Sequence, residues 1–219
     1  MVPTVGNSCE CGLTYVRGLD EDEKRHARFH SEYARGPKIT QLKQLPTLGL
    51  VNKLTIHVVD RTVPEAIRKK VAHVAYVAAR SMPGSPAGYD GTHIENDDVR
   101  LYLLAKGNHV VAIVITALDP FAWNLKWGRD GAVELIEKRQ IPNPKPTICR
   151  VWVAADYRKK GLAVSLITEE CKHLNVSPQM LGWVLPFTTG GQAVARKFSP
   201  DNFFGHCDPY TLQDVLNPK

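Results

Sequence analysis

The sequence predicts a mixed α/β (α+β) domain, preceded by a small module that contains cysteines and histidines. Two observations support this fold class. Apolar segments with strand patterns alternate with amphipathic segments, in the order strand, helix, hairpin, strand, helix, strand, helix, which is typical of helices packed on a sheet and not of a bundle or sandwich. The chain has 219 residues, of which 43% are hydrophobic, enough for one packed domain and a small appendage.

Charge and cysteine content restrict the classes of partner and the compartment. The net charge of +6 suits an anionic partner such as a phosphorylated cofactor, nucleic acid or chromatin, but it is too small for a dense nucleic-acid-binding tail. No apolar run is long enough to span a membrane, and the first ten residues lack a secretory pattern. Five cysteines at irregular spacing favour an intracellular, reducing location with free or metal-bound thiols.

Residues 1–36 form the first predicted unit, around SCECGLTYVRGLDEDEKRHARFH. Cys9 and Cys11 precede His26 and His30, and the histidines are four residues apart, so they share one helix face. Two thiolates and two imidazoles suit one zinc ion, whose binding would supply folding energy to this polar segment. The Cys-x-Cys spacing is shorter than in most fingers, and the alternative is a degenerate finger without metal.

Residues 37–50 contain Pro37, Pro46 and Gly49 and are predicted as a linker to a main domain at 51–219. The main domain opens with the alternating strand LTIHVVD at 54–60. A helix is expected next, because Pro64 suits a helix start and apolar residues follow at helical spacing. These apolar residues are Ile67, Val71, Val74 and Ala78.

The middle of the main domain predicts a hairpin and a strand between two loops. Residues 82–91 are a turn-rich loop, and 99–118 read as a hairpin that turns at Lys106–Asn108. The proline-rich segment IPNPKP at 141–146 is expected to be a stiff loop, and TICRVWVAA at 147–155 a strand. A helix to about residue 174, a strand at 181–185 and a short helix at 190–198 follow.

The segment DYRKKGLAVSLI joins that strand to its helix without a spacer. Such a junction points the free N–H groups of the helix start away from the strand end, where they favour an anion. Gly161 allows close approach of the backbone, and Ala163 keeps the first helical turn narrow. Arg158, Lys159 and Lys160 add positive charge for phosphates. The alternative is a solvated turn whose lysines only maintain solubility.

The pattern Arg-x-x-Gly-x-Ala resembles the pyrophosphate loop of GNAT acyltransferases, which hold acetyl-CoA there. Around it, CGLTYVRGLDEDEKRHARFHSEYARG resembles the small finger that opens the sister-chromatid cohesion acetyltransferases. CRVWVAADYRKKGLA is similar to that family's Ser-Arg-Ile-Trp-Val strand and cofactor loop, and the hairpin and LPFTTGGQAVARKF have counterparts in the same order. The resemblance covers residues 8–200 and identifies a divergent member with a GNAT acetyltransferase domain at 51–219.

The resemblance implies a function and a cofactor site. The family transfers acetyl from acetyl-CoA to lysine side chains on the ATPase head of cohesin, so a nuclear location and chromatin association are expected. The strand backbone would pair with the pantetheine arm, and the turn would hold the pyrophosphate. The implied cofactor-binding residues are Val151, Trp152, Val153, Arg158, Lys159, Lys160, Gly161, Leu162 and Ala163.

The acceptor half departs from the family. The serine before Arg-Ile-Trp-Val is Cys149, and the family's helical glutamate falls on Thr168. Its Ser-Asp-Pro segment reads Val184-Leu185-Pro186, without the aspartate that would assist lysine deprotonation. The remaining candidates for catalysis are Glu169, Glu170 and Cys149, although one glutamate is expected to face water and Cys149 can be a small buried residue. His206 and Tyr210, in a tail without a counterpart in the family, are further candidates for the acceptor pocket.

Three functions therefore stay open. The first is an acetyl-CoA-dependent protein lysine acetyltransferase of the cohesion type. The second is an acetyltransferase of the same fold that acts on a small amine or another protein, because the acceptor motif has changed. The third is a non-catalytic module that binds CoA, or an interaction protein that acts through its finger. The intact cofactor loop favours an enzyme.

Overall fold

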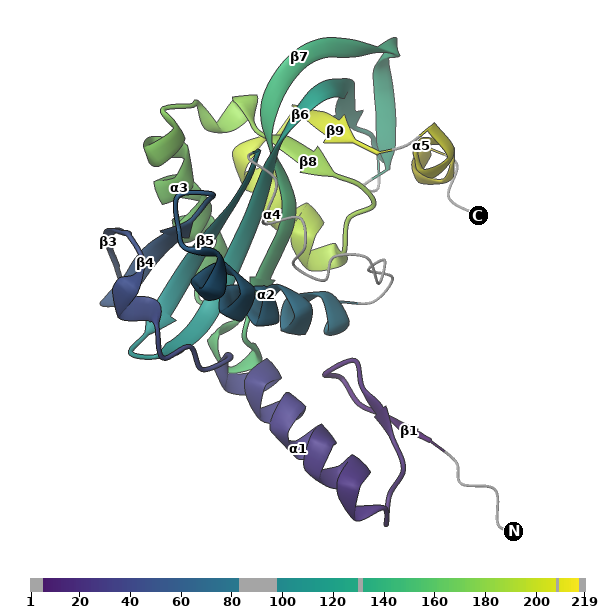
Figure 1. Ribbon diagram of the computed structural model, residues 1–219. Helices are drawn as coiled ribbons and strands as arrows, with labels where there is room; N and C mark the ends of the chain where they lie inside the picture. Colours follow the sequence, from purple (N-terminus) through teal and green to yellow (C-terminus); the bar gives the residue numbers. More distant parts are fainter. Residues whose placement is uncertain (1–5, 83–97, 130–131, 208, 217–219) are drawn as a thin grey trace.

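A seven-stranded mixed sheet forms the centre of the computed structural model, which describes residues 6–82, 98–129, 132–207 and 209–216 (Figure 1). The order in the sheet is the order in the chain, with an additional pairing between β6 and β9. Pairing is antiparallel from β3 to β7 and parallel from β7 to β9. The strands are β3 (Thr47–Val51), β4 (Leu54–Val59), β5 (Val99–Lys106), β6 (His109–Trp127), β7 (Val133–Val153), β8 (Gly182–Val184) and β9 (Asn202–His206).

Helices cover both faces of the sheet, as the alternating sequence pattern predicts. The helices α1 (Asp20–Arg35) and α2 (Glu65–Arg80) bury apolar residues in one core cluster, together with one face of β5, β6 and β7. The helices α3 (Leu162–Leu174) and α4 (Thr189–Phe198) contribute to a second cluster on the other face. Among the described residues, no helix is long and apolar enough to cross a membrane.

The N-terminal module packs against α2 and the 3₁₀ turn after β7. A two-stranded hairpin of β1 (Asn7–Ser8) and β2 (Thr14–Tyr15) precedes α1. Cys11, Phe29 and Tyr33 are buried in the same core cluster as Val71 and Val74 of α2. The module therefore shares its apolar core with the larger domain (Figure 1).

The segment 37–50, where we expected a linker, contributes to the fold. Ile39, Leu42 and Leu45 are buried, Leu42–Gln44 form a 3₁₀ turn, and β3 adds an edge strand beside β4. Prolines, lysines and glutamines separate the apolar residues of this segment at irregular intervals. Hydrophobic periodicity therefore did not predict β3.

Most other predicted elements are confirmed, and two further regions differ. The predicted loop at 141–146 is part of β7, which pairs with β6 over its whole length. Register shifts between Asp119 and Phe121 and between Trp123 and Leu125 interrupt this pairing, and such bulges accommodate prolines in a strand. The C-terminal tail forms β9 and α5 (Pro209–Leu216), which were not expected. The predicted loop at 82–91 lies outside the described residues, apart from Met82.

Candidate active site and metal cluster

The turn after β7 has the geometry of an anion site. It follows β7 through a 3₁₀ turn (Ala155–Tyr157), and α3 begins directly after Gly161. Gly161 has φ of 74°, and its carbonyl oxygen accepts the first helical bond, while no side chain caps the helix. The first N–H groups of α3 thus have no intrahelical partner. A side chain at position 161 would meet nothing within 4 Å, so the space before the turn is open.

The edge of β7 beside this turn is open. The parallel pairing of β7 with β8 comprises Thr147 with Gly182 and Ile148 with Trp183. Beyond Ile148, β7 continues to Val153 and pairs with β6 on its other side. Within the described part of the chain, no strand pairs with β7 on the β8 side after Ile148. The diverging strands therefore leave the backbone of 149–153 without a strand partner on this side, along the edge that leads to the turn.

The strand residues that we predicted for the cofactor site have side chains on both faces of the sheet. The side chain of Trp152 is buried in the cluster with α1 and α2, so it is the backbone of this residue that lies at the open edge. Val151 and Val153 are half-buried and pack toward α3. Leu162 is buried under the helix start, and Ala163 is half-buried beside it. These two small or apolar residues position the helix start against the sheet.

The three cations of the turn differ in their contacts. Arg158 donates from Nε to the carbonyl of Val153 at 3.0 Å and from Nη1 to the hydroxyl of Tyr33 at 2.8 Å. Lys160 donates to the carbonyl of Asp156 at 2.6 Å. Lys159 is exposed and, like Gly161, has a left-handed backbone. Arg158 and Lys160 therefore bond to the backbone or to α1 and hold the turn in shape, while the Lys159 side chain is exposed.

The two candidate glutamates occupy different environments. Glu169 is half-buried and forms an ion pair with Lys172 at 2.6 Å. Glu170 is completely buried between α3 and the sheet, where the hydroxyl of Thr116 donates to one carboxyl oxygen and the other has no partner. Burial raises the pKa of Glu170 to about 8, against the opposing effects of Thr116 and Arg100. The carboxyl group of Glu170 is thus mostly protonated at pH 7, and it is enclosed between α3 and the sheet.

The third candidate, Cys149, lies on the opposite face of the sheet. It is half-buried, packs against the cluster that contains α2, and donates from Sγ to the carbonyl of Thr147 at 3.5 Å. The structure therefore does not bring Cys149 and Glu170 together, since the sheet separates them. The catalytic roles of all three residues stay predictions.

A histidine that sequence patterns alone could not place lies near the last pair of β7 and β8. His206, on β9, is 8% exposed, and its Nδ1 lies 3.4 Å from Oδ2 of Asp119 on β6. Its Nε2 is buried without a hydrogen-bond partner and points toward Gly182. Burial lowers the pKa of His206, and Asp119 opposes this shift. No local motif connects His206 with Asp119, because strand pairing alone brings them together.

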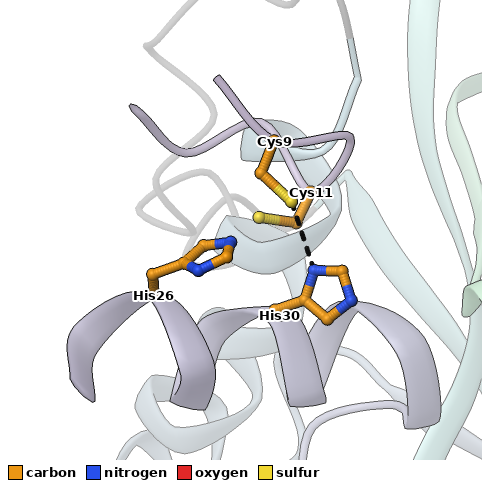
Figure 2. A group of neighbouring side chains, drawn as sticks. All are labelled: Cys9, Cys11, His26 and His30. Atoms are coloured by element: carbon orange, nitrogen blue, oxygen red, sulfur yellow. Dashed lines mark hydrogen bonds between the residues drawn. The ribbon is translucent and has the colours of Figure 1, made fainter. Parts of the chain in front are cut away.

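The predicted metal ligands converge. The ligand atoms of Cys9, Cys11, His26 and His30 all lie within 4.8 Å of one another (Figure 2). The cysteines come from the loop between β1 and β2, and the histidines from adjacent turns of α1. Sγ of Cys9 lies 3.3 Å from Nδ1 of His30.

The chemistry of these four side chains fits a zinc ion. Two sulfur and two imidazole donors form a tetrahedral set that zinc prefers. Nε2 of His26 is buried and has no hydrogen-bond partner, so this nitrogen is available to a metal. The ring of His26 stacks on Tyr15 with centroids 3.9 Å apart and planes at 6°, which fixes its orientation. The predicted grouping of the four residues is confirmed.

Comparison with known proteins supports the predicted fold. No protein-family model matches the chain, and no curated protein matches it. Among solved structures, the xEco2 acetyltransferase domain bound to a CoA conjugate aligns with 74% of this chain and 97% of its own, at 16% identity and a TM-score of 0.59. A second structure of the xEco2 acetyltransferase domain covers 74% and 96%, at 16% identity and a TM-score of 0.56. The predicted GNAT fold is confirmed.

Proposed function

We propose that this protein is an acetyl-CoA-dependent N-acetyltransferase whose acceptor is a lysine amine of another protein. One observation carries the proposal: the open edge of β7 leads directly into the turn at Arg158–Gly161 and the start of α3. A strand edge and a helix start in series can bind a long ligand that carries amides at one end and phosphates at the other. The shared fold with the xEco2 domain bound to a CoA conjugate supports this ligand.

The open edge and the turn have separate roles in binding. The backbone of Val151–Val153 pairs with the amide groups of the pantetheine arm, in the way another strand would. The N–H groups of Leu162 and Ala163 bind the pyrophosphate, assisted by the helix dipole. The Lys159 ammonium adds charge at the mouth of the turn. Arg158 keeps the turn in register with β7 through its bond to Val153.

The reaction requires a neutral amine and a stabilised oxyanion. The acetyl group arrives as a thioester, which an amine can attack directly. Backbone N–H groups on the open edge of β7 are placed to donate to the carbonyl oxygen as negative charge develops on it. A base must take one proton from the acceptor ammonium beforehand.

For the acceptor, we propose a cohesin-type lysine at a chromatin-bound, nuclear location, on the basis of the sequence resemblance. A specific observation favours an alternative, in which the acceptor is a small amine or another protein. Leu185, which replaces the family's aspartate, is only 4% exposed and packs in the core cluster beneath α3 and α4. This position therefore offers no carboxylate to an incoming lysine, and the acceptor site must be organised differently.

We also propose that Cys9, Cys11, His26 and His30 bind one zinc ion. The hairpin of β1 and β2 is only two residues deep on each strand and buries little apolar surface besides Cys11. Metal binding would supply the free energy that orders it. Through α1, this ordering extends to Tyr33 and the cofactor turn.

One assay tests the proposed function. The protein is incubated with acetyl-CoA and, in parallel, with a cohesin-head domain, spermidine, spermine and a panel of small amines, while CoA release and product mass are followed. An acetylated lysine on the cohesin head supports the first acceptor class, and an acetylated amine supports the second. Tight CoA binding without turnover on any acceptor would overturn the enzyme proposal and leave a CoA-binding module.

A further inference from the structure

We propose that His206, oriented by Asp119, is the general base that takes the proton from the acceptor amine. This inference rests on the proposed function. The unpartnered Nε2 of His206 lies on the face of the sheet opposite α3, beside Gly182 and one residue before the last pair of β7 and β8. The proposal assigns this face to the acceptor.

The position of Nε2 follows from a glycine on β8. A Cβ atom on Gly182 would lie 2.8 Å from Nε2 of His206 and 2.6 Å from Oγ1 of Thr147. A side chain at position 182 would therefore displace both groups. Gly182 pairs with Thr147, and Val184 pairs with His206, so the three strands hold these atoms together. Two polar atoms thus converge beside Gly182, one residue before Ile148 and Trp183, the last pair of β7 and β8.

Strand alternation shows which face these groups share. Ile148 and Trp183 pack in the cluster with α3, so Thr147 and Gly182 face the other way. Phe203 also packs toward α3, which places Phe204 and His206 on the opposite face. Cys149 lies on the same face as Thr147, and its bond to the carbonyl of Thr147 places it next along β7 toward the open edge. His206 is therefore close to the inner end of the proposed cofactor edge and is not covered by α3.

Asp119 orients the imidazole. Its carboxylate, 3.4 Å from Nδ1, favours a proton on that nitrogen and leaves the lone pair on Nε2. Near His206, the titratable and charged groups on this face are Asp119 on β6 and Lys145, Cys149 and Arg150 on β7. Arg150 belongs to this face because it pairs with Ile115 of the cluster that contains α2, whereas β8 presents Gly182 and Val184. Since burial lowers the pKa of His206 more than Asp119 raises it, the imidazole is neutral at pH 7 and can accept a proton.

The proton balance is complete with these groups. Nε2 takes one proton from the acceptor ammonium, and the neutral amine forms the new C–N bond to the thioester carbonyl. The C–S bond breaks, and the departing thiolate takes the second proton from the attacking nitrogen. The imidazolium then releases its proton to solvent. The products are the acetylated amine, CoA thiol and one proton.

The test measures kcat/KM against pH for three variants, with acetyl-CoA and whichever of the cohesin-head domain, spermidine or spermine gives turnover with the unaltered protein. His206→Gln is expected to lower kcat/KM at pH 8 by about 100-fold or more and to abolish its rise with pH on the acid side of neutrality, where a histidine with a lowered pKa loses its proton. Asp119→Asn is expected to give a smaller loss and a shifted pH profile. The control His73→Gln removes another histidine–carboxylate pair, with Glu32 at 2.9 Å outside the sheet, and should leave the profile unchanged.

The two proposals fail in different ways. No turnover by the unaltered protein overturns the proposed function and the role of His206 with it. Turnover by the unaltered protein together with an unchanged pH profile in folded His206→Gln overturns only the base assignment. If His206→Gln does not fold, the pH profile of Asp119→Asn tests the base assignment instead. This variant is expected to fold, because the Asp119 side chain is partly exposed and an amide has the same shape. An unchanged profile in that variant also overturns the inference.

Discussion

Arg158 and Tyr33 join the cofactor turn to the N-terminal module. Nη1 of Arg158 donates to the Tyr33 hydroxyl at 2.8 Å, and the guanidinium carbon lies 4.8 Å from the centre of the same ring. Tyr33 is buried near the C-terminal end of α1, and two turns of this helix carry His26 and His30 of the Cys/His cluster. The contact therefore couples the shape of the turn to the order of the metal cluster.

Tyr33→Phe tests this coupling, because it removes the hydroxyl and keeps the ring. We expect the KM for acetyl-CoA to rise several-fold with little change in kcat, since the turn loses a restraint and no reacting group changes. The free energy of unfolding should fall by about 0.5–1.5 kcal/mol, the usual net value of a hydrogen bond. Tyr76→Phe is the matched control, because Arg80 donates to the Tyr76 hydroxyl at 3.3 Å on the exposed side of α2. Equal effects of the two substitutions on KM would contradict the coupling.

Zinc binding by the N-terminal cluster predicts a stoichiometry of about one ion per chain. Cys11→Ser should abolish it, because a hydroxyl is a poor zinc ligand at neutral pH. Metal analysis of the purified proteins measures the ratio, and thermal unfolding with and without a chelator measures the stability that the metal contributes. Cys171→Ala is the control, since Cys171 is buried in the second core cluster beneath α3. A ratio near zero in the unaltered protein would refute the four-ligand site.

Two substitutions of Gly161 distinguish the effect of backbone strain from the effect of added charge at the cofactor turn. Its φ of 74° strains any other residue, and its open surroundings mean that a new side chain would enter the ligand space. Gly161→Ala should weaken acetyl-CoA binding moderately, and Gly161→Asp should weaken it further by adding negative charge beside the pyrophosphate. Calorimetric titration with CoA measures both. Affinity that is unchanged in Gly161→Asp would refute the assignment of the turn.

Local sequence predicts the turn and the metal cluster, whereas the acceptor face depends on tertiary pairing. Gly161 lies in a short basic turn between a strand and a helix, and His26 and His30 share a helix face, so sequence spacing predicts both features. The residues His206 and Asp119 meet only because β9 pairs beside β8 and because β6 continues past Ala117. That extension pairs with the part of β7 that contains the proline-rich segment 141–146, which the sequence indicated as a loop. Glu170 could be placed on a helix from the sequence, but not on its buried face, because Glu169 and Glu170 are adjacent and equally polar.

The buried carboxyl of Glu170 predicts how stability depends on pH. Burial raises its pKa in the folded protein to about 8, from an ordinary value of 4.5. Between these values the unfolded chain loses the proton and the folded chain keeps it, so stability falls as pH rises, by at most about 1.4 kcal/mol per pH unit. Below pH 4.5 both states are protonated, and this group costs nothing.

Glu170→Gln preserves the shape of the side chain and removes its titratable proton. The stability of this variant should therefore not decline as pH rises, and near pH 8 it should exceed the stability of the unaltered protein. Urea unfolding at several pH values measures the difference. Glu169→Gln, one residue earlier and paired with Lys172 at the helix surface, is the control and should retain the decline. A decline of equal slope in Glu170→Gln would mean that another group causes it. Full loss of the decline with retained turnover would assign Glu170 to the packing of α3 and exclude it as the base.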